Sequence, residues 1–195
     1  MRVSLPGVVL ATIAIGLAAC SDASMPTKPG VASPTTLRAD RQSDEHSMTV
    51  QLMDDCDPTT FNGPGGPGPG TCVKKGGGVK FDQFIAEITH LQRAPAWRMS
   101  PGNVNLHVGD ILASANAGGE VHTFTEVEEF GGGIIPFLND LAGTPTVANE
   151  CKNLPPSAFL APGATTSEVT DEAHDEKYQC CIHPWMRAVV HIAAK

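Results

Sequence analysis

The chain has 195 residues, of which 41% are hydrophobic, and this length accommodates one ordinary domain with tails or two very small domains. Its 13 basic residues are outnumbered by 21 acidic ones, and the formal net charge is -8. No cluster of Lys or Arg offsets this balance, which argues against a nucleic-acid partner. Aromatic residues make up only 5%, while 20 Gly and 16 Pro predict many turns and argue against an all-helical bundle.

Residues 1–19 have the pattern of a signal peptide, because the apolar run that begins at Val8 is too short to span a bilayer comfortably. The run ends in Leu17–Cys20, which resembles a bacterial lipobox, although an ordinary cleavage site beside an incidental cysteine is the alternative. The lipobox resemblance implies a lipoprotein anchored through acylated Cys20 in an extracytoplasmic, periplasmic space. By resemblance to enteric sorting rules, Ser21 points to the outer membrane.

Residues 20–78 are rich in Ser, Thr, Pro, Asp and Gly, and Gly63–Gly70 contains only Gly and Pro. Such a composition buries too little apolar surface to offset the entropy of ordering, so we expect a disordered tether. Only Met48–Met53 has the pattern of a strand. Cys56 and Cys72 flank the Gly/Pro stretch and could close it as a disulfide.

Residues 79–195 have the composition of a folded domain. Apolar residues recur with helical spacing at 81, 84, 85 and 88, which predicts a short N-terminal helix, and the periodicity then changes to two. The turn signals between the apolar runs predict an antiparallel β-sandwich with a loop or helical insertion at 130–151. The expected strands are 104–108, 111–115, 122–127, 158–160, 177–182 and 186–192.

A concentration of soft metal ligands lies near the C-terminus, where Cys180, Cys181, His183 and Met186 fall within seven residues. Thiolate, imidazole and thioether together suit copper better than magnesium or calcium. A trigonal copper site needs a second imidazole from elsewhere in the fold. His122 is the best candidate, because it begins an expected strand directly after a glycine-containing turn.

These residues resemble the cupredoxin family, closest to its plastocyanin-like and amicyanin-like members. The shared pattern consists of Gly109-Asp110, Asn116, His122 and the run Cys180-x-x-His183-Pro184-Trp185-Met186-Arg187. The resemblance implies an all-β, Greek-key sandwich that holds one copper ion cycling between Cu(I) and Cu(II). The implied equatorial ligands are His122, Cys180 and His183, and the implied axial ligand is Met186.

The sequence departs from the family pattern at two places. Thr123 occupies the position at which many cupredoxins have an Asn that braces the cysteine-bearing loop. The cysteine is also doubled, and strand alternation allows only one of Cys180 and Cys181 to face the metal. The family spacing selects Cys180, the alternative being a strained vicinal disulfide between the two.

Four cysteines then remain for disulfides, namely Cys56, Cys72, Cys151 and Cys181, and four cysteines can pair in three ways. We prefer Cys56 with Cys72 and Cys151 with Cys181.

The resemblance implies an electron carrier rather than an enzyme, because no coordination position is left open for a substrate. In the family, electrons pass through the exposed edge of the C-terminal histidine, so Pro184 and Trp185 would line the docking patch here. We expect a monomer whose partner is a redox protein such as a cytochrome or a membrane oxidoreductase. Acidic residues could steer a basic partner or simply be a solvated surface. A surface-tethered copper storage or delivery protein is the main alternative, and a copper-free sandwich is a weaker one.

Overall fold

The computed structural model describes residues 46–195. The expected signal peptide at 1–19, the lipidated Cys20 and the first part of the expected tether lie outside the described residues. Within residues 46–195, no helix is long and apolar enough to cross a membrane.

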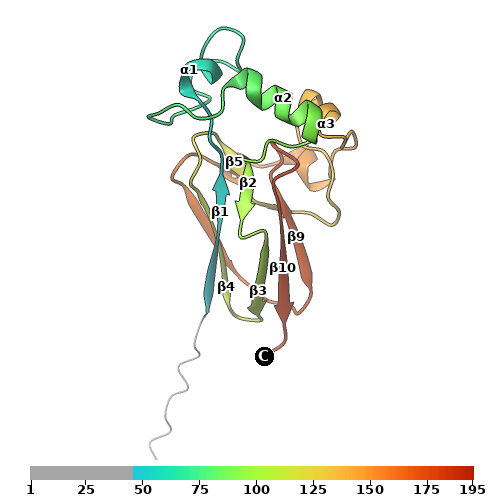
Figure 1. Ribbon diagram of the computed structural model, residues 1–195. Coiled ribbons are helices and arrows are strands. Elements are labelled where there is room, and N and C mark those ends of the chain that lie inside the picture. The colour runs from blue at the N-terminus through green and yellow to red at the C-terminus, as the bar shows by residue number, and fades with distance from the viewer. Residues whose placement is uncertain (1–45) are drawn as a thin grey trace, which may run out of the picture. The chain divides into compact units, whose positions relative to one another are not determined.

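Two four-stranded sheets form the body of the domain (Figure 1). The first sheet has the strand order β2-β1-β4-β8 and the second has the order β3-β10-β9-β6, while β5 and β7 form a separate pair. The bounds of the strands are Ser47–Met53 (β1), Arg98–Ser100 (β2), Asn103–His107 (β3), Ile111–Asn116 (β4), His122–Thr123 (β5), Thr125–Glu126 (β6), Phe159–Leu160 (β7), Thr165–Val169 (β8), Asp175–Gln179 (β9) and Arg187–Ala193 (β10).

Alternating burial explains why these segments form strands. In β3, Val104 and Leu106 are buried while their neighbours are exposed, and β10 repeats the pattern through Val190 and Ile192. These side chains share one core with buried residues of the first sheet, among them Leu112 of β4. The prediction of an all-β sandwich is therefore confirmed.

The prediction of an antiparallel sandwich is wrong, because both sheets are mixed. Strand β1 runs parallel to β4, and β10 runs parallel to β3, whereas β1 with β2, β4 with β8, β10 with β9 and β6 with β9 are antiparallel. An alternating pattern identifies a half-buried strand, but it carries no information about the partner or its direction.

The boundary expected at residue 79 is also wrong, because the described part of the expected tether belongs to the sandwich. Strand β1 lies between β2 and β4, with Val50 and Leu52 buried. A short helix α1 (Pro58–Phe61) follows, and its Phe61 ring stacks on Trp97 with ring centroids 5.7 Å apart. The Gly/Pro stretch is tied down by the Cys56–Cys72 disulfide, so one buried strand and one covalent link order this segment despite its composition.

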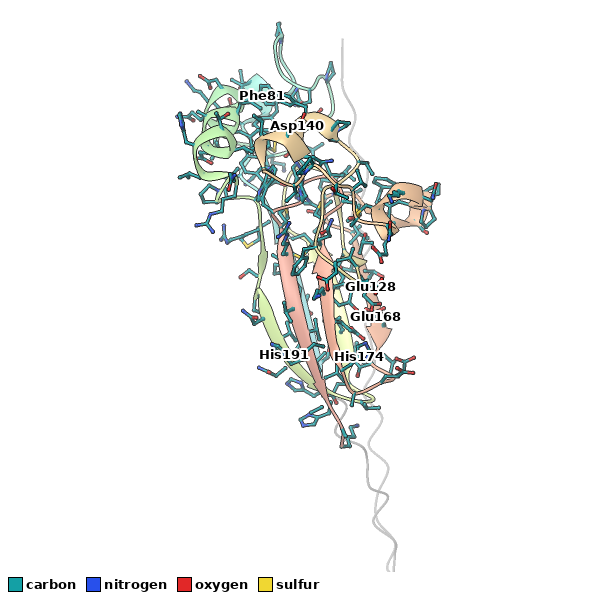
Figure 2. The ribbon with its side chains drawn as sticks, turned by 90° about the vertical axis from the view of Figure 1, so that its right-hand side faces the viewer. Phe81, Glu128, Asp140, Glu168, His174 and His191 are labelled. Atoms are coloured by element: carbon teal, nitrogen blue, oxygen red, sulfur yellow. A yellow bond between two sulfur atoms is a disulfide. The ribbon has the colours of Figure 1, made fainter. Side chains whose placement is uncertain are left out.

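Three helices gather at one end of the sandwich, away from the C-terminus (Figure 1). The expected N-terminal helix is α2 (Phe81–Leu91), which buries Phe84 and Ile88 and ends at Gln92 in a left-handed conformation (φ 57°). The insertion contains α3 (Pro136–Leu141) and two 3-10 helices, Glu150–Asn153 and Pro156–Ala158. In Figure 2, the labelled Phe81 of α2 and Asp140 of α3 lie at this same end.

Candidate metal centre

The loop between β9 and β10 carries three of the four expected ligands. Its two ends are joined by a hydrogen bond from the Cys180 N–H to the Met186 carbonyl (3.0 Å), and the Met186 N–H donates to the His183 carbonyl (2.9 Å). Cys180, His183 and Met186 are all buried. The backbone therefore fixes the spacing of these side chains in a tight, closed turn.

The fourth expected ligand, His122, comes from β5, which pairs with β7 through Leu160. Its Nδ1 lies 3.8 Å from the Cys180 Sγ, and the Nδ1 of His183 lies 3.9 Å from the same sulfur. The ligand atoms of these three buried residues all lie within 4.8 Å of one another. The structure thus brings together His122, Cys180 and His183, which are 61 positions apart in the chain at most, and encloses Met186 in the same loop.

The surroundings of Cys180 favour the thiolate. Burial alone would raise the pKa of the thiol, but hydrogen bonds with His122 and His183 outweigh burial and hold this pKa well below its usual value. The backbone N–H groups of Thr123 (3.4 Å) and His183 (3.5 Å) also donate to the sulfur. Burial would lower the pKa of His122, yet its hydrogen bonds with Asp54 and Cys180 raise it to about 9.

The donor set fits a soft metal ion. Two imidazole nitrogens and one thiolate converge, and a thioether-bearing methionine belongs to the same loop, a combination typical of copper sites. Within residues 46–195, Cys180 is the only cysteine outside a disulfide, because Cys56 pairs with Cys72 and Cys151 pairs with Cys181. This is the pairing preferred from the sequence.

Thr123 braces the cysteine-bearing loop. Its hydroxyl oxygen accepts a hydrogen bond from the Cys181 N–H (2.8 Å), and it also accepts one from the Thr125 hydroxyl (3.0 Å). On the other side, the Cys151–Cys181 disulfide ties the loop to the insertion. The hydrogen bond that braces the cysteine-bearing loop is therefore made here by a threonine in place of the Asn found in many cupredoxins.

The sequence reasoning missed Asp54, which directly follows β1. Its Oδ2 lies 2.9 Å from the Nε2 of His122, and both side chains are completely buried. The same oxygen accepts hydrogen bonds from the N–H groups of Gly119 (2.8 Å) and Glu120 (3.0 Å). Burial raises the pKa of Asp54, but the His122 hydrogen bond and these backbone donors hold it well below its usual value. The sequence feature that could have indicated Asp54 is its position: it is an acidic residue directly after the strand-like segment Met48–Met53.

Glu120 was also missed, and it stands beside the other imidazole. Its Oε2 accepts a hydrogen bond from the Trp97 Nε1–H (2.6 Å) and lies 3.6 Å from the Nε2 of His183. Burial raises the pKa of Glu120, although the charge of His183 opposes this effect. Each candidate histidine ligand therefore has a carboxylate behind the nitrogen that faces away from Cys180.

The expected docking patch at Pro184 and Trp185 is not an exposed surface. Pro184 is buried, Trp185 is half-buried, and only 3% of His183 is exposed. The cause is helix α2, whose Phe84 ring lies 5.9 Å from the Trp185 ring and 6.2 Å from the His183 ring. The helix expected at the start of the domain therefore packs over the β9–β10 loop and covers it.

No protein-family model and no curated protein matches the chain. Among solved structures, it is similar to a novel purple cupredoxin from Nitrosopumilus maritimus, with a TM-score of 0.40 and 16% identity over 74% of this chain and 98% of that one. It is also similar to oxidised plastocyanin from Dryopteris crassirhizoma (TM-score 0.37, 8% identity, 74% and 99% covered) and to a Cu(I) form of an amicyanin variant (TM-score 0.33, 18% identity, 49% and 72% covered). At these TM-scores, the function has to be inferred from the side chains of the site.

Proposed function

We propose that the protein binds one copper ion, which His122, Cys180 and His183 would hold with Met186 as a fourth ligand, and carries single electrons between redox partners. The main support is the convergence of two imidazole nitrogens, at 3.8 and 3.9 Å, on a buried thiol whose pKa is held well below its usual value. A copper ion bound there would supply a one-electron couple between Cu(I) and Cu(II).

The residues around the ligands keep them in one arrangement. Two backbone N–H groups donate to the Cys180 sulfur, Asp54 fixes the ring of His122, and Thr123 holds the backbone next to the cysteine. Ligands held in this way move little when the charge of the ion changes, which favours fast electron exchange. Their burial leaves little room for water or substrate at the ion and supports a carrier rather than an enzyme.

The proposal includes an extracytoplasmic location, with the chain anchored to a bacterial membrane through Cys20. Two disulfides support an oxidising compartment, because disulfides are rare in the reducing cytosol. The proposed partner is another redox protein.

The test is the visible spectrum of residues 21–195 after addition of Cu(II), compared with two variants. Cys180→Ser removes the proposed ligand, whereas the double variant Cys151→Ser/Cys181→Ser removes the neighbouring cysteine together with its disulfide partner. We expect an intense thiolate-to-copper band in the parent and in the double variant, and none in Cys180→Ser. A band that survives in Cys180→Ser would overturn the ligand assignment.

Cyclic voltammetry of the copper-loaded protein separates an electron carrier from a storage or delivery protein. A carrier gives a reversible one-electron wave and retains Cu(I) over many cycles. Loss of Cu(I) to a competing chelator on reduction would favour storage or delivery instead.

A further inference from the structure

A partly open cavity of about 380 Å³ lies over His183, between the Gly/Pro stretch and helices α2 and α3. Phe81 and Asp140, labelled in Figure 2, mark the two helices at this end of the molecule. The volume lies near the lower end of the range for small-molecule sites. It therefore suits a molecule built around a single ring.

The wall of the cavity is aromatic. Phe61, Phe81, Phe84 and Phe137 line it, and the centroids of the Phe61 and Phe81 rings lie 5.5 and 6.0 Å from that of Phe84. Edge-to-face and offset contacts with such rings favour a planar aromatic guest. The outer residues Val121, Ile135 and Phe137 are 38%, 36% and 57% exposed, so an apolar molecule reaches the cavity over an apolar surface.

Two ionisable side chains, Glu120 and His183, also line this apolar space. Oε2 of Glu120 already accepts the Trp97 N–H, whereas Oε1 accepts no hydrogen bond from any residue between 46 and 195. A carboxylate oxygen in an apolar cavity stabilises a guest that donates a hydrogen bond and disfavours an anionic guest. Because Glu120 lies beside His183, the donor group of a guest bound to Glu120 would lie at the edge of the proposed metal centre.

We propose that this cavity is a binding site for a small phenol or hydroquinone, with the ring among the phenylalanines and the hydroxyl group donating to Glu120. The site is formed by the polypeptide alone, so it does not depend on the proposed copper function and can be measured in metal-free protein.

Isothermal titration of the metal-free full chain with p-cresol, toluene and benzylamine tests the proposal. We expect saturable binding of one p-cresol, about tenfold tighter than toluene, because the p-cresol hydroxyl donates a hydrogen bond to the carboxylate and toluene has no donor. Glu120→Gln should reduce the ratio between the two affinities. Absence of saturable binding, equal binding of toluene, or tighter binding of the benzylammonium cation would overturn the phenol assignment.

Two substitutions locate the bound molecule. Ile85→Trp fills the cavity from α2 and should abolish p-cresol binding, while Leu91→Trp, on an exposed position of the same helix outside the cavity, should leave it unchanged. Ile135→Trp narrows the entrance without entering the core and serves if Ile85→Trp does not fold. Unchanged binding in a folded Ile85→Trp or Ile135→Trp variant would place the phenol elsewhere. A further outcome would also overturn the proposal: no phenol binds, but a redox protein binds the parent and not the Phe137→Ala variant. This result would show that the cavity receives a side chain of a partner protein.

Discussion

Asp54 Oδ2 and His122 Nε2 lie 2.9 Å apart, and neither side chain has any exposed surface. Because an ionised carboxylate only accepts hydrogen bonds, Nε2 carries the proton and donates it to Asp54. A metal would bind at Nδ1, the nitrogen 3.8 Å from the Cys180 sulfur, and would displace the proton there while Nε2 keeps its own. Asp54 therefore fixes both the tautomer and the orientation of the imidazole.

Replacing Asp54 by Asn should weaken copper binding by about 10- to 100-fold, the usual effect of removing a group that orients a ligand. It should also raise the reduction potential, because the lost negative charge stabilises Cu(II) more than Cu(I). Competition with a chelator and voltammetry measure the two effects.

Asp57→Asn is the matched control for this prediction. Asp57 accepts hydrogen bonds from the Thr59 and Thr60 N–H groups at the start of α1 and makes no hydrogen bond to His122. The Asp57→Asn substitution should therefore leave the reduction potential unchanged. Equal potentials in the parent and in Asp54→Asn would show that Asp54 has no influence on the metal.

A fragment of residues 79–195 should not fold cooperatively. It lacks β1, which pairs with both β2 and β4 and contributes Val50 and Leu52 to the core, and it lacks Asp54. A fragment of residues 42–195 keeps all of these and should melt in one cooperative transition, as followed by circular dichroism. A sharp melting transition in the shorter fragment would restore the domain boundary expected from composition.

The parts of the fold that could be predicted from the sequence are those that depend on patterns among residues close together in the chain. Alternation in β3 and β10 and the helical spacing in α2 each lie within a dozen residues, and the Cys180–Met186 loop carries its ligands within one turn. The Asp54–His122 contact could not be seen in this way, because it joins residues 68 positions apart. It exists only because β1 enters the first sheet parallel to β4, a pairing that composition did not reveal.

Thr123→Val should destabilise the protein by roughly 1–3 kcal/mol, because the Cys181 N–H loses its acceptor inside the protein. Thr123→Ser keeps the hydroxyl and should retain most of the stability, which separates the hydrogen bond from the packing of the methyl group. Urea denaturation measures the stabilities, and the thiolate-to-copper band reports any movement of Cys180. Equal stability of the Val and Ser variants would mean that the hydroxyl does not brace the loop.

The last prediction concerns the carboxylates around Glu126, in the edge strand β6. Glu126 is exposed, yet the protein around it partly desolvates the carboxylate and raises its pKa, and the charges of Glu176 and Glu168 raise this pKa further. The Tyr178 hydroxyl lies within hydrogen-bond distance of both Glu168 (2.6 Å) and Glu176 (2.7 Å), which places these two carboxylates close together. The ionised form of Glu126 is therefore disfavoured in the folded protein.

A raised pKa in the folded state means that the folded protein binds more protons than the unfolded chain, whose glutamates titrate near about 4.3. The free energy of unfolding should therefore decrease as the pH rises from that value through the folded-state pKa of Glu126. Glu126→Gln should be more stable than the parent at pH 7, with the advantage largely lost at pH 4, and high salt should reduce it. Urea denaturation at both pH values measures this. Glu172→Gln, at an exposed position, is the control, and an equal gain in that variant would mean that only the net charge of the protein matters.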